Sequence, residues 1–335
     1  MPKVSIIIPV YNAENYLARC LDSVCNQTLD SVEVICINDY STDNSIDILN
    51  KYANKYSNLK IINCKENGGE SKARNIGLEA SSGEYLAFVD NDDTIDNNFC
   101  EKLYKKAVET DADIVKGEIH DIHYDGSSTY GYLNPKIREH HSKFYFAYHW
   151  WTAIYKSSLI KDNNIKFLEG YPLGGDILFL NEAIIKCKKL ELVDDVYYHY
   201  CRREDSGDSK ILSFEKIKSA IAIIKMISEN IQATGIHDEG TTFVISSWLL
   251  QLLNYPFRTT DEKVLKFVLG ELLNYYQSSK DWIKDEPEFL GVLPVVMDLI
   301  KKNDLDTILE FYKKNNSQPK MRIANLRFMH NRNRS

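Results

Sequence analysis

The sequence predicts an α/β protein with a Rossmann-like, wound and mostly parallel central sheet, followed by an α-helical C-terminal region. Short β-branched runs alternate with helical patterns from residue 4 to about 118, and this alternation is typical of βαβ units. Polar and acidic residues follow several of the runs directly, as ligand sites at the carboxyl ends of strands require. From about residue 213 the pattern changes to amphipathic helices.

The first part of the chain supplies the sheet. Predicted strands span residues 4–8, 32–37, 60–62, 85–89 and 113–115. Apolar residues at helical spacing lie between the first two strands, for example Leu17, Cys20, Leu21 and Val24. Residues 119–210 are less regular, with predicted strands at 152–155 and 196–200 and a helix at 176–188, and this region is expected to build an acceptor pocket.

The length of the chain predicts its domain organisation, and its cysteine content predicts which ligands a metal site would use. At 335 residues the chain exceeds the usual size of one domain, so we predict a catalytic domain over 1–210 and a helical accessory domain over 211–335. The seven cysteines include no CxxC pair, which favours reduced, buried thiols. A metal, if one is bound, must therefore be held by carboxylates.

Charge and hydropathy restrict the cellular location and the classes of ligand that we expect. The net charge of −7 disfavours nucleic acid as a ligand. No run approaches the roughly 20 apolar residues of a membrane span, and the N-terminus reads as a strand rather than a signal peptide, so we expect a cytoplasmic protein. The tail 319–335 mixes basic and apolar residues. It either contacts the anionic inner face of the membrane or is a frayed, solvated terminus.

Three acids follow one hydrophobic strand and are the strongest sign of chemistry. Asp90, Asp92 and Asp93 come directly after the strand at 85–89. Such carboxylates repel one another unless a cation or ligand neutralises them, and Mg²⁺ or Mn²⁺ suits oxygen ligands and phosphates. The alternative is an acidic turn that caps the next helix.

Two further turns contain candidate nucleotide ligands. Asp39 ends the second strand, where an acid can accept a hydrogen bond from an imide N–H, although turn and helix-cap chemistry explains its neighbours equally well. Gly68 and Gly69 precede a helix carrying Lys72 and Arg74. The glycines permit close backbone approach, and the cations can reach phosphate.

In this order and spacing, four motifs resemble the family-2 glycosyltransferases of GT-A fold. They are Pro9-Val10-Tyr11-Asn12, Asn38-Asp39-Tyr40-Ser41-Thr42-Asp43, Gly68-Gly69 with Ala73-Arg74-Asn75, and Asp90-Asn91-Asp92-Asp93. Residues 151–157 also resemble the family's Trp-containing strand, which lines the sugar pocket. The resemblance covers about the first 205 residues.

The resemblance implies a set of roles. Tyr11 would stack on uracil, Asp39 would bind its imide, and Asp90 and Asp92 would hold Mn²⁺ or Mg²⁺, with Asn91 as the intervening position. Asp176 occupies the position of the catalytic base, although Gly175 replaces the commoner Glu before it; helix capping is the other role for Asp176. The residues implied in binding the nucleotide sugar are Pro9, Tyr11, Asn12, Asp39, Lys72, Arg74, Asp90, Asn91, Trp151, Arg202 and Arg203.

The implied function is an inverting transfer of a hexosyl or N-acetylhexosaminyl group from a UDP-sugar to a glycan or lipid-linked acceptor in surface-polysaccharide synthesis. Asp176 would deprotonate the acceptor hydroxyl. The C-terminal helices could form a homodimer or dock a partner. Two alternatives stay open: a nucleotidyltransferase of similar fold, disfavoured because no Gly-rich basic loop follows the first strand, and a non-catalytic glycan-binding or scaffold protein.

Overall fold

The computed structural model describes residues 1–131, 142–203, 213–258, 261–283 and 304–315, together with positions 298 and 302. The chain forms two compact units. The first comprises Met1–Tyr132, Tyr148–Gly170 and Gly175–Ser206, and the second comprises Leu133–Ala147, Tyr171–Gly174 and Gly207–Ser335. The second unit thus includes two short segments that precede residue 175, which no local pattern in the sequence indicates.

A nine-stranded sheet organises the first unit, in the order β3-β2-β1-β4-β8-β6-β9-β5 with β7 paired to β6. The three pairs β3–β2, β2–β1 and β1–β4 are parallel, as predicted. Strand β8 runs antiparallel to β4 and β6, whereas β6 and β9 are parallel. The strands are β1 Val4–Val10, β2 Val32–Asn38, β3 Leu59–Asn63, β4 Tyr85–Phe88, β5 Thr94–Ile95, β6 Ile114–Ile122, β7 Ser128–Gly131, β8 Ala153–Lys156 and β9 Leu190–Cys201.

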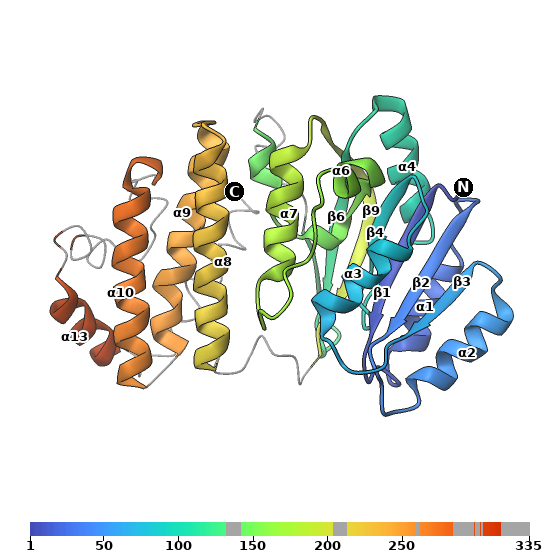
Figure 1. The fold of residues 1–335 in the computed structure, drawn as a ribbon, viewed down its shortest axis with the longest axis horizontal. Coiled ribbons are helices and arrows are strands. Elements are labelled where there is room, and N and C mark those ends of the chain that lie inside the picture. Colours follow the sequence, from blue (N-terminus) through green and yellow to red (C-terminus); the bar gives the residue numbers. More distant parts are fainter. Residues whose placement is uncertain are drawn as a thin grey trace. The chain divides into compact units, whose positions relative to one another are not determined.

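Helices cover both faces of this sheet (Figure 1). Ile6 and Ile8 of β1 belong to the same core cluster as α1 and α4 residues, whereas Ile7 lies against Gly77 of α3. Because successive residues of a strand point to opposite faces, β1 is buried along its whole length. The helical segments of this unit are α1 Leu17–Cys25, α2 Ser45–Lys55, α3 Glu70–Ala80, α4 Phe99–Thr110, 3₁₀ segment η2 Trp150–Thr152, α6 Ser157–Asp162 and α7 Gly175–Lys186.

The second unit is helical where it is described. The predicted apolar stripe of its first long helix, Ile217, Ile221, Ile224 and Ile231, is buried. The Tyr275 hydroxyl donates to the Ile245 carbonyl at 3.0 Å and lies 2.7 Å from the Ser228 hydroxyl, so it links three helices. The helical segments are η1 Lys143–Phe146, α8 Phe214–Ala233, α9 Glu239–Asn254, η4 Tyr255–Arg258, α10 Glu262–Ser279, η5 Lys280–Trp282 and α13 Leu305–Asn315.

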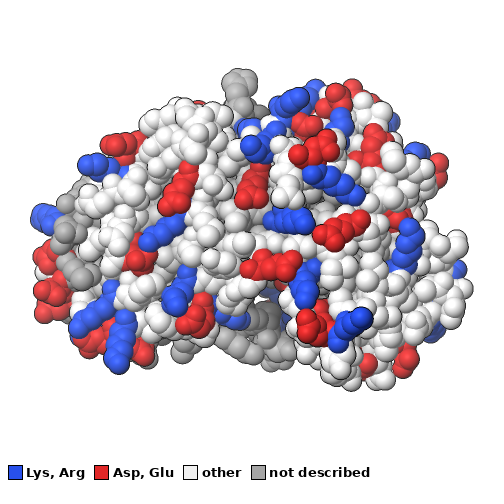
Figure 2. Space-filling view, in the orientation of Figure 1, with Lys and Arg blue, Asp and Glu red and all other residues white. Residues whose placement is uncertain are grey.

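Acidic and basic side chains alternate over the face of the molecule drawn in Figure 2. Among the ion pairs of the described residues, Glu262 in α10 pairs with Lys266 at 3.0 Å and with Lys313 at 3.1 Å. Such exposed pairs contribute little to stability. Among the residues described, no helix is both long and apolar enough to span a bilayer. The basic tail 319–335, on which the predicted membrane contact depends, lies outside the described residues.

Candidate functional site

The three acids that follow β4 have three different environments. Asp90 accepts a 2.7 Å hydrogen bond from Nη2 of buried Arg74. Asp92 forms an ion pair with Nε of Arg203 at 3.0 Å. Arginines of the chain itself therefore neutralise part of the charge that the sequence argument assigned to a metal, and repulsion between the carboxylates does not by itself require one.

Asp93 fastens the acidic turn to strand β9. Its buried carboxylate accepts hydrogen bonds from the Tyr198 hydroxyl at 2.8 Å and the Cys201 backbone N–H at 2.7 Å. Burial, followed by the charges of Asp90 and Asp92, raises the pKa of Asp93 well above its usual value. The turn continues into β5 rather than into a helix, because α4 begins only at Phe99. The alternative interpretation, in which the acidic turn caps the next helix, therefore does not hold for Asp93.

Arg74 lies at the centre of the site. Its guanidinium also pairs with Glu70, and its Cζ atom lies 4.5 Å from the centroid of the Trp150 ring. Burial lowers the pKa of Arg74, but the Glu70 and Asp90 carboxylates raise it above the usual value. The Arg74 charge lowers the pKa of Glu70, whose side chain is 60% exposed. Partial desolvation and the charges of Asp90, Asp176 and Asp92 raise that pKa, and the net shift is upward. Arg74 is therefore a fixed cation inside a group of carboxylates.

Asp90 and Asp92 suit a hard divalent cation that arrives with a phosphate ligand. Their side chains are 24% and 20% exposed, so both can be reached. Burial and the Asp90 charge raise the pKa of Asp92, while Arg203 lowers it, and a cation would stabilise this carboxylate further. The described residues contain no group of three or more His, Cys, Asp or Glu that could hold a metal alone. Mg²⁺ commonly uses one or two carboxylates plus substrate phosphates, which these two fit.

The turns after β1 and β2 form the other half of the site. Buried Asp39 accepts from the backbone N–H groups of Gly68 and Gly69, both at 2.8 Å. This fixes the loop that starts α3, where Gly69 has a φ of 81°, a conformation that favours glycine. Each Asp39 oxygen keeps a second lone pair for a ligand N–H.

The remaining residues predicted to contact the nucleotide are placed as follows. Oδ1 of Asn12 accepts from the Thr42 backbone N–H at 2.8 Å, tying the two turns together. The Asn91 side chain donates to the Pro9 carbonyl at 2.8 Å, and this hydrogen bond holds the end of β1 to the acidic turn. The Tyr11 ring is 49% exposed and available for stacking.

Lys72 differs from its neighbour Arg74. Its ammonium forms a 3.3 Å ion pair with Glu66, and its side chain is 42% exposed. Lys72 is therefore a surface cation, whereas Arg74 is buried against Asp90.

Asp176 stands at the start of α7, where Trp150 orients it. Oδ2 accepts from the Trp150 indole N–H at 3.0 Å, and Oδ1 accepts from the Ile177 backbone N–H at 2.9 Å. Gly175 before it is buried, and a Cβ added there would lie 2.9 Å from the Leu168 carbonyl oxygen. This contact explains why the commoner Glu is absent from position 175.

Trp151 points to a different neighbourhood from Trp150. Its ring lies 5.7 Å from that of Tyr200, with an interplanar angle of 30°. Its indole N–H is buried, and no hydrogen-bond partner for it occurs among the residues described. The strand predicted at 152–155 begins one residue later, at Ala153, because residues 150–152 form a 3₁₀ turn.

A buried lysine holds the backbone that presents Trp150. Nζ of Lys116, on β6, donates to the carbonyl oxygens of Tyr148 at 2.7 Å and His149 at 2.9 Å. His149 has a φ of 51°, which is strained for a residue with a side chain. Burial lowers the pKa of Lys116 to about 7. Lys116 therefore restrains the turn that aims Trp150 at Asp176.

The sequence did not predict four of these residues as parts of the site. They are Glu70, Lys116, Arg19 and Trp150, the last as the partner of Asp176. Arg19 donates to the Asp92 carbonyl oxygen at 2.6 Å. Glu70 offered a signal, since an acid four residues before Arg74 is a helical ion-pair spacing. The position of Lys116, directly after the predicted strand at 113–115, also indicated a buried charge with a structural role.

Comparisons with known proteins identify the family of the chain. Residues 5–166 match the model of glycosyl transferase family 2. The putative glycosyltransferase EpsH of Bacillus subtilis is 31% identical, over 76% of this chain and 77% of its own length. A poly(ribitol-phosphate) β-glucosyltransferase of Bacillus spizizenii is 29% identical over 92% of this chain, which spans half of that relative's length.

The fold has a solved counterpart. The crystal structure of residues 1–349 of Staphylococcus aureus TarS in complex with UDP-GlcNAc superposes with a TM-score of 0.74 at 23% identity, and the match covers 94% of this chain and 92% of that one. The likeness shows that this chain has the same GT-A fold with a helical C-terminal region.

The ionisation of Lys116 makes a pH-dependent contribution to stability. Between its folded pKa of about 7 and its ordinary value near 10.5, the unfolded chain binds the proton and the folded chain does not, so stability rises with pH in this window. From pH 7 to 9, we expect wild type to gain roughly 1 kcal/mol per pH unit relative to Lys116→Met.

Urea unfolding at several pH values measures this difference, and exposed Lys51→Met is the control. A difference between wild type and Lys116→Met that stays constant with pH would contradict a buried, partly neutral lysine.

Proposed function

The chain belongs to glycosyl transferase family 2, and we propose that it transfers a sugar from a UDP-sugar to a hydroxyl group of a glycan or lipid-linked acceptor, with inversion. One observation carries the proposal: Asp90, Arg74, Trp150 and Asp176 form a continuous series of contacts. This series of contacts connects Asp90, which suits a metal-bound diphosphate, to Asp176, which suits the role of a base. A catalytic site of this family needs both at a fixed separation.

The nucleotide end of the donor fits the turns after β1 and β2. Tyr11 offers an exposed ring for stacking on uracil, and Asp39 can accept the imide N–H beside the backbone groups it already binds. Asn12, Pro9 and Asn91 support this binding by fixing the turns. Preorganised polar groups of this kind give orientation at little entropic cost.

The diphosphate fits between the acids and the arginines. Asp90 and Asp92 would hold Mn²⁺ or Mg²⁺, which when bound would supply positive charge opposite the leaving diphosphate. Arg203 is already paired with Asp92. A metal-bound diphosphate at Asp92 would therefore also lie beside the Arg203 guanidinium. Arg74 fixes the position of Asp90 from the buried side.

Asp176 is the proposed catalytic base. Trp150 and the Ile177 backbone N–H each hold one of its oxygens, which leaves a lone pair for the proton of an acceptor hydroxyl. The hydroxyl oxygen then attacks the anomeric carbon as the bond to the diphosphate breaks on the opposite face. Because this is one displacement, an α-linked donor gives a β-linked product.

The proposed biological context is synthesis of a surface polysaccharide or lipid-linked oligosaccharide on the cytoplasmic face of the membrane. It rests on the relatives, one of which is named for poly(ribitol-phosphate). Residues 1–210 would perform the transfer, while residues 211–335 would serve dimerisation or docking.

Asp176→Asn should lower sugar transfer by about 10²–10⁴-fold, because general base catalysis contributes about that much, while UDP affinity changes less than about twofold. Turnover of a panel of UDP-sugars and calorimetric binding of UDP measure the two effects. Exposed Asp162→Asn on α6 is the matched control. A wild type without sugar transfer or donor hydrolysis would instead identify a non-catalytic protein.

Trp150→Phe should keep an aromatic ring over Arg74 but remove the hydrogen bond to Asp176. We expect kcat to fall by about tenfold, the equivalent of 1.4 kcal/mol, and donor KM to change by less than about twofold, because the lost contact orients the base only. Trp282→Phe in η5 makes the same chemical change in the second unit. Equal effects of the two substitutions would disprove the orienting role.

Chelation should weaken UDP binding by about tenfold or more if Asp90 and Asp92 share a divalent ion with the diphosphate. Calorimetry with Mn²⁺ and with a chelator measures this effect, and Asp92→Asn should remove most of it. If UDP binds equally well with chelator and after both acids are changed to Asn, metal dependence is rejected.

A further inference from the structure

Glu70 is a partly exposed carboxylate of the candidate site that has no role in the proposed mechanism. It is the first residue of α3, and its side chain is 60% exposed. Its Oε1 atom accepts a hydrogen bond from Nη2 of Arg74, whereas Oε2 has no hydrogen-bond partner among the residues that the structure describes. An exposed carboxylate oxygen with free lone pairs can accept a hydrogen bond from a ligand.

Arg74 holds Glu70 close to the acidic turn. The same guanidinium nitrogen, Nη2, donates to Glu70 and to Oδ1 of Asp90. Because each of these hydrogen bonds spans about 3 Å, the two accepting oxygens lie within about 6 Å of each other. Asp90 is proposed to share a metal ion with the donor diphosphate. Glu70 therefore lies close to the place where the diphosphate joins the sugar.

The start of α3 also lies beside the start of α7. A Cβ added at Gly175 would lie 3.1 Å from Oγ of Ser71. Gly175 directly precedes Asp176, and Ser71 directly follows Glu70. Trp150 contacts both groups, because its N–H donates to Asp176 and its ring covers the guanidinium that holds Glu70. Glu70 therefore stands at the helix end that borders the proposed base.

The transferred sugar has to occupy the space that Glu70 borders. In a single displacement with inversion, the attacking hydroxyl and the leaving group lie on opposite faces of the anomeric carbon. The ring that contains this carbon is therefore placed between the diphosphate at Asp90 and the base Asp176. Glu70 can accept hydrogen bonds from hydroxyl groups of that ring.

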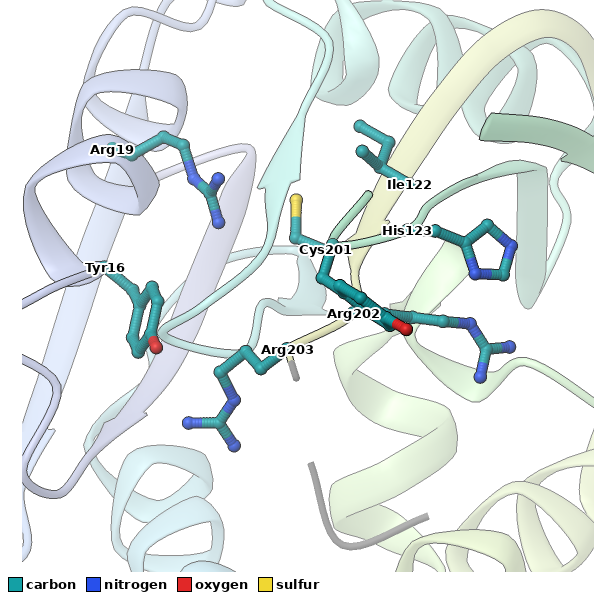
Figure 3. Close-up of a pocket in the computed structure, with 8 residues that line it drawn as sticks. Tyr16, Arg19, Ile122, His123, Cys201, Arg202 and Arg203 are labelled. Carbon is teal, nitrogen blue, oxygen red and sulfur yellow. The ribbon is translucent and has the colours of Figure 1, made fainter. Parts of the chain in front are cut away.

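A negative charge on the sugar would be disfavoured beside Glu70. Arg74, the cation that binds Glu70, is already shared with Asp90. Arg203 is directed toward the Tyr16 ring, in a cavity of about 570 Å³ whose lining does not include Glu70 (Figure 3). Like charges that face each other cost free energy, and binding sites use such contacts to reject competing ligands.

Resting on the proposed glycosyltransferase function, we propose that Glu70 determines the donor specificity of the enzyme. It accepts hydrogen bonds from hydroxyl groups of the transferred sugar, and its charge rejects donors whose sugar carries a carboxylate, such as UDP-uronic acids. The competing role is that of a counter-ion for Arg74 alone. The two roles have different consequences for UDP and for UDP-sugars, because UDP lacks the sugar.

Calorimetric titration of the full chain with Mn²⁺ compares UDP, UDP-glucose, UDP-galactose and the two matching UDP-uronic acids. Wild type should bind the tighter neutral donor at least about tenfold more tightly than its uronic acid. Glu70→Gln should weaken binding of this neutral donor by about tenfold, as expected for loss of one charge-assisted hydrogen bond. The preference over the uronic acid should then disappear, while UDP affinity changes by less than about twofold. Glu70→Asp keeps the charge and should still reject the uronic acids.

Glu79→Gln at the other end of α3 is the matched control, because Glu79 is 70% exposed and pairs with Lys166 at 3.2 Å. It should leave all of these affinities unchanged. If wild type binds the uronic acids as tightly as the matching neutral donors, the inference is overturned. It is also overturned if Glu70→Gln lowers the affinities for UDP and for the neutral donor by the same factor. A wild type that binds no UDP would instead contradict the proposed function.

Discussion

The buried ion pair between Arg74 and Asp90 is the interaction on which the site depends. Arg74 is almost fully buried, yet it retains its charge because Asp90 and Glu70 accept from it and the Trp150 ring covers its face. Removing one partner of such a pair leaves an uncompensated charge in the interior. The position of the acidic turn, the start of α3 and the 3₁₀ turn at residues 150–152 are therefore coupled through one guanidinium group.

This coupling explains why the site can be both charged and rigid. Asp93 fixes the acidic turn to β9 through Tyr198 and Cys201, and Lys116 fixes the turn that carries Trp150. Each restraint uses a buried polar group whose partners are backbone or aromatic groups. Within the acidic turn, Asp90 and Asp92 are the carboxylates that stay partly exposed.

The two turns that border the site differ in chemistry. The side with Tyr11 and Asp39 presents an exposed ring and backbone-anchored acceptors, which suit a planar base. The side with Arg19, Arg202 and Arg203 presents guanidinium groups, two of which pair with Asp121 and Asp92. Asp92 lies where the two meet, because it belongs to the acidic turn and pairs with Arg203.

The sequence by itself determined the parallel part of the sheet, because runs such as residues 4–8 and 32–37 are rich in β-branched residues and are separated by apolar residues at helical spacing. It also determined the family, since the motifs at Asp39, Arg74 and Asp90 keep a specific order. Only the tertiary structure decided that Arg74 pairs with Asp90 and that Trp150, rather than Trp151, orients Asp176. The tertiary structure also shows that a side chain at position 175 would meet the Leu168 carbonyl oxygen. These facts depend on contacts between residues from 16 to 26 positions apart and on the space beside Leu168, and local pattern carries no information about such distances.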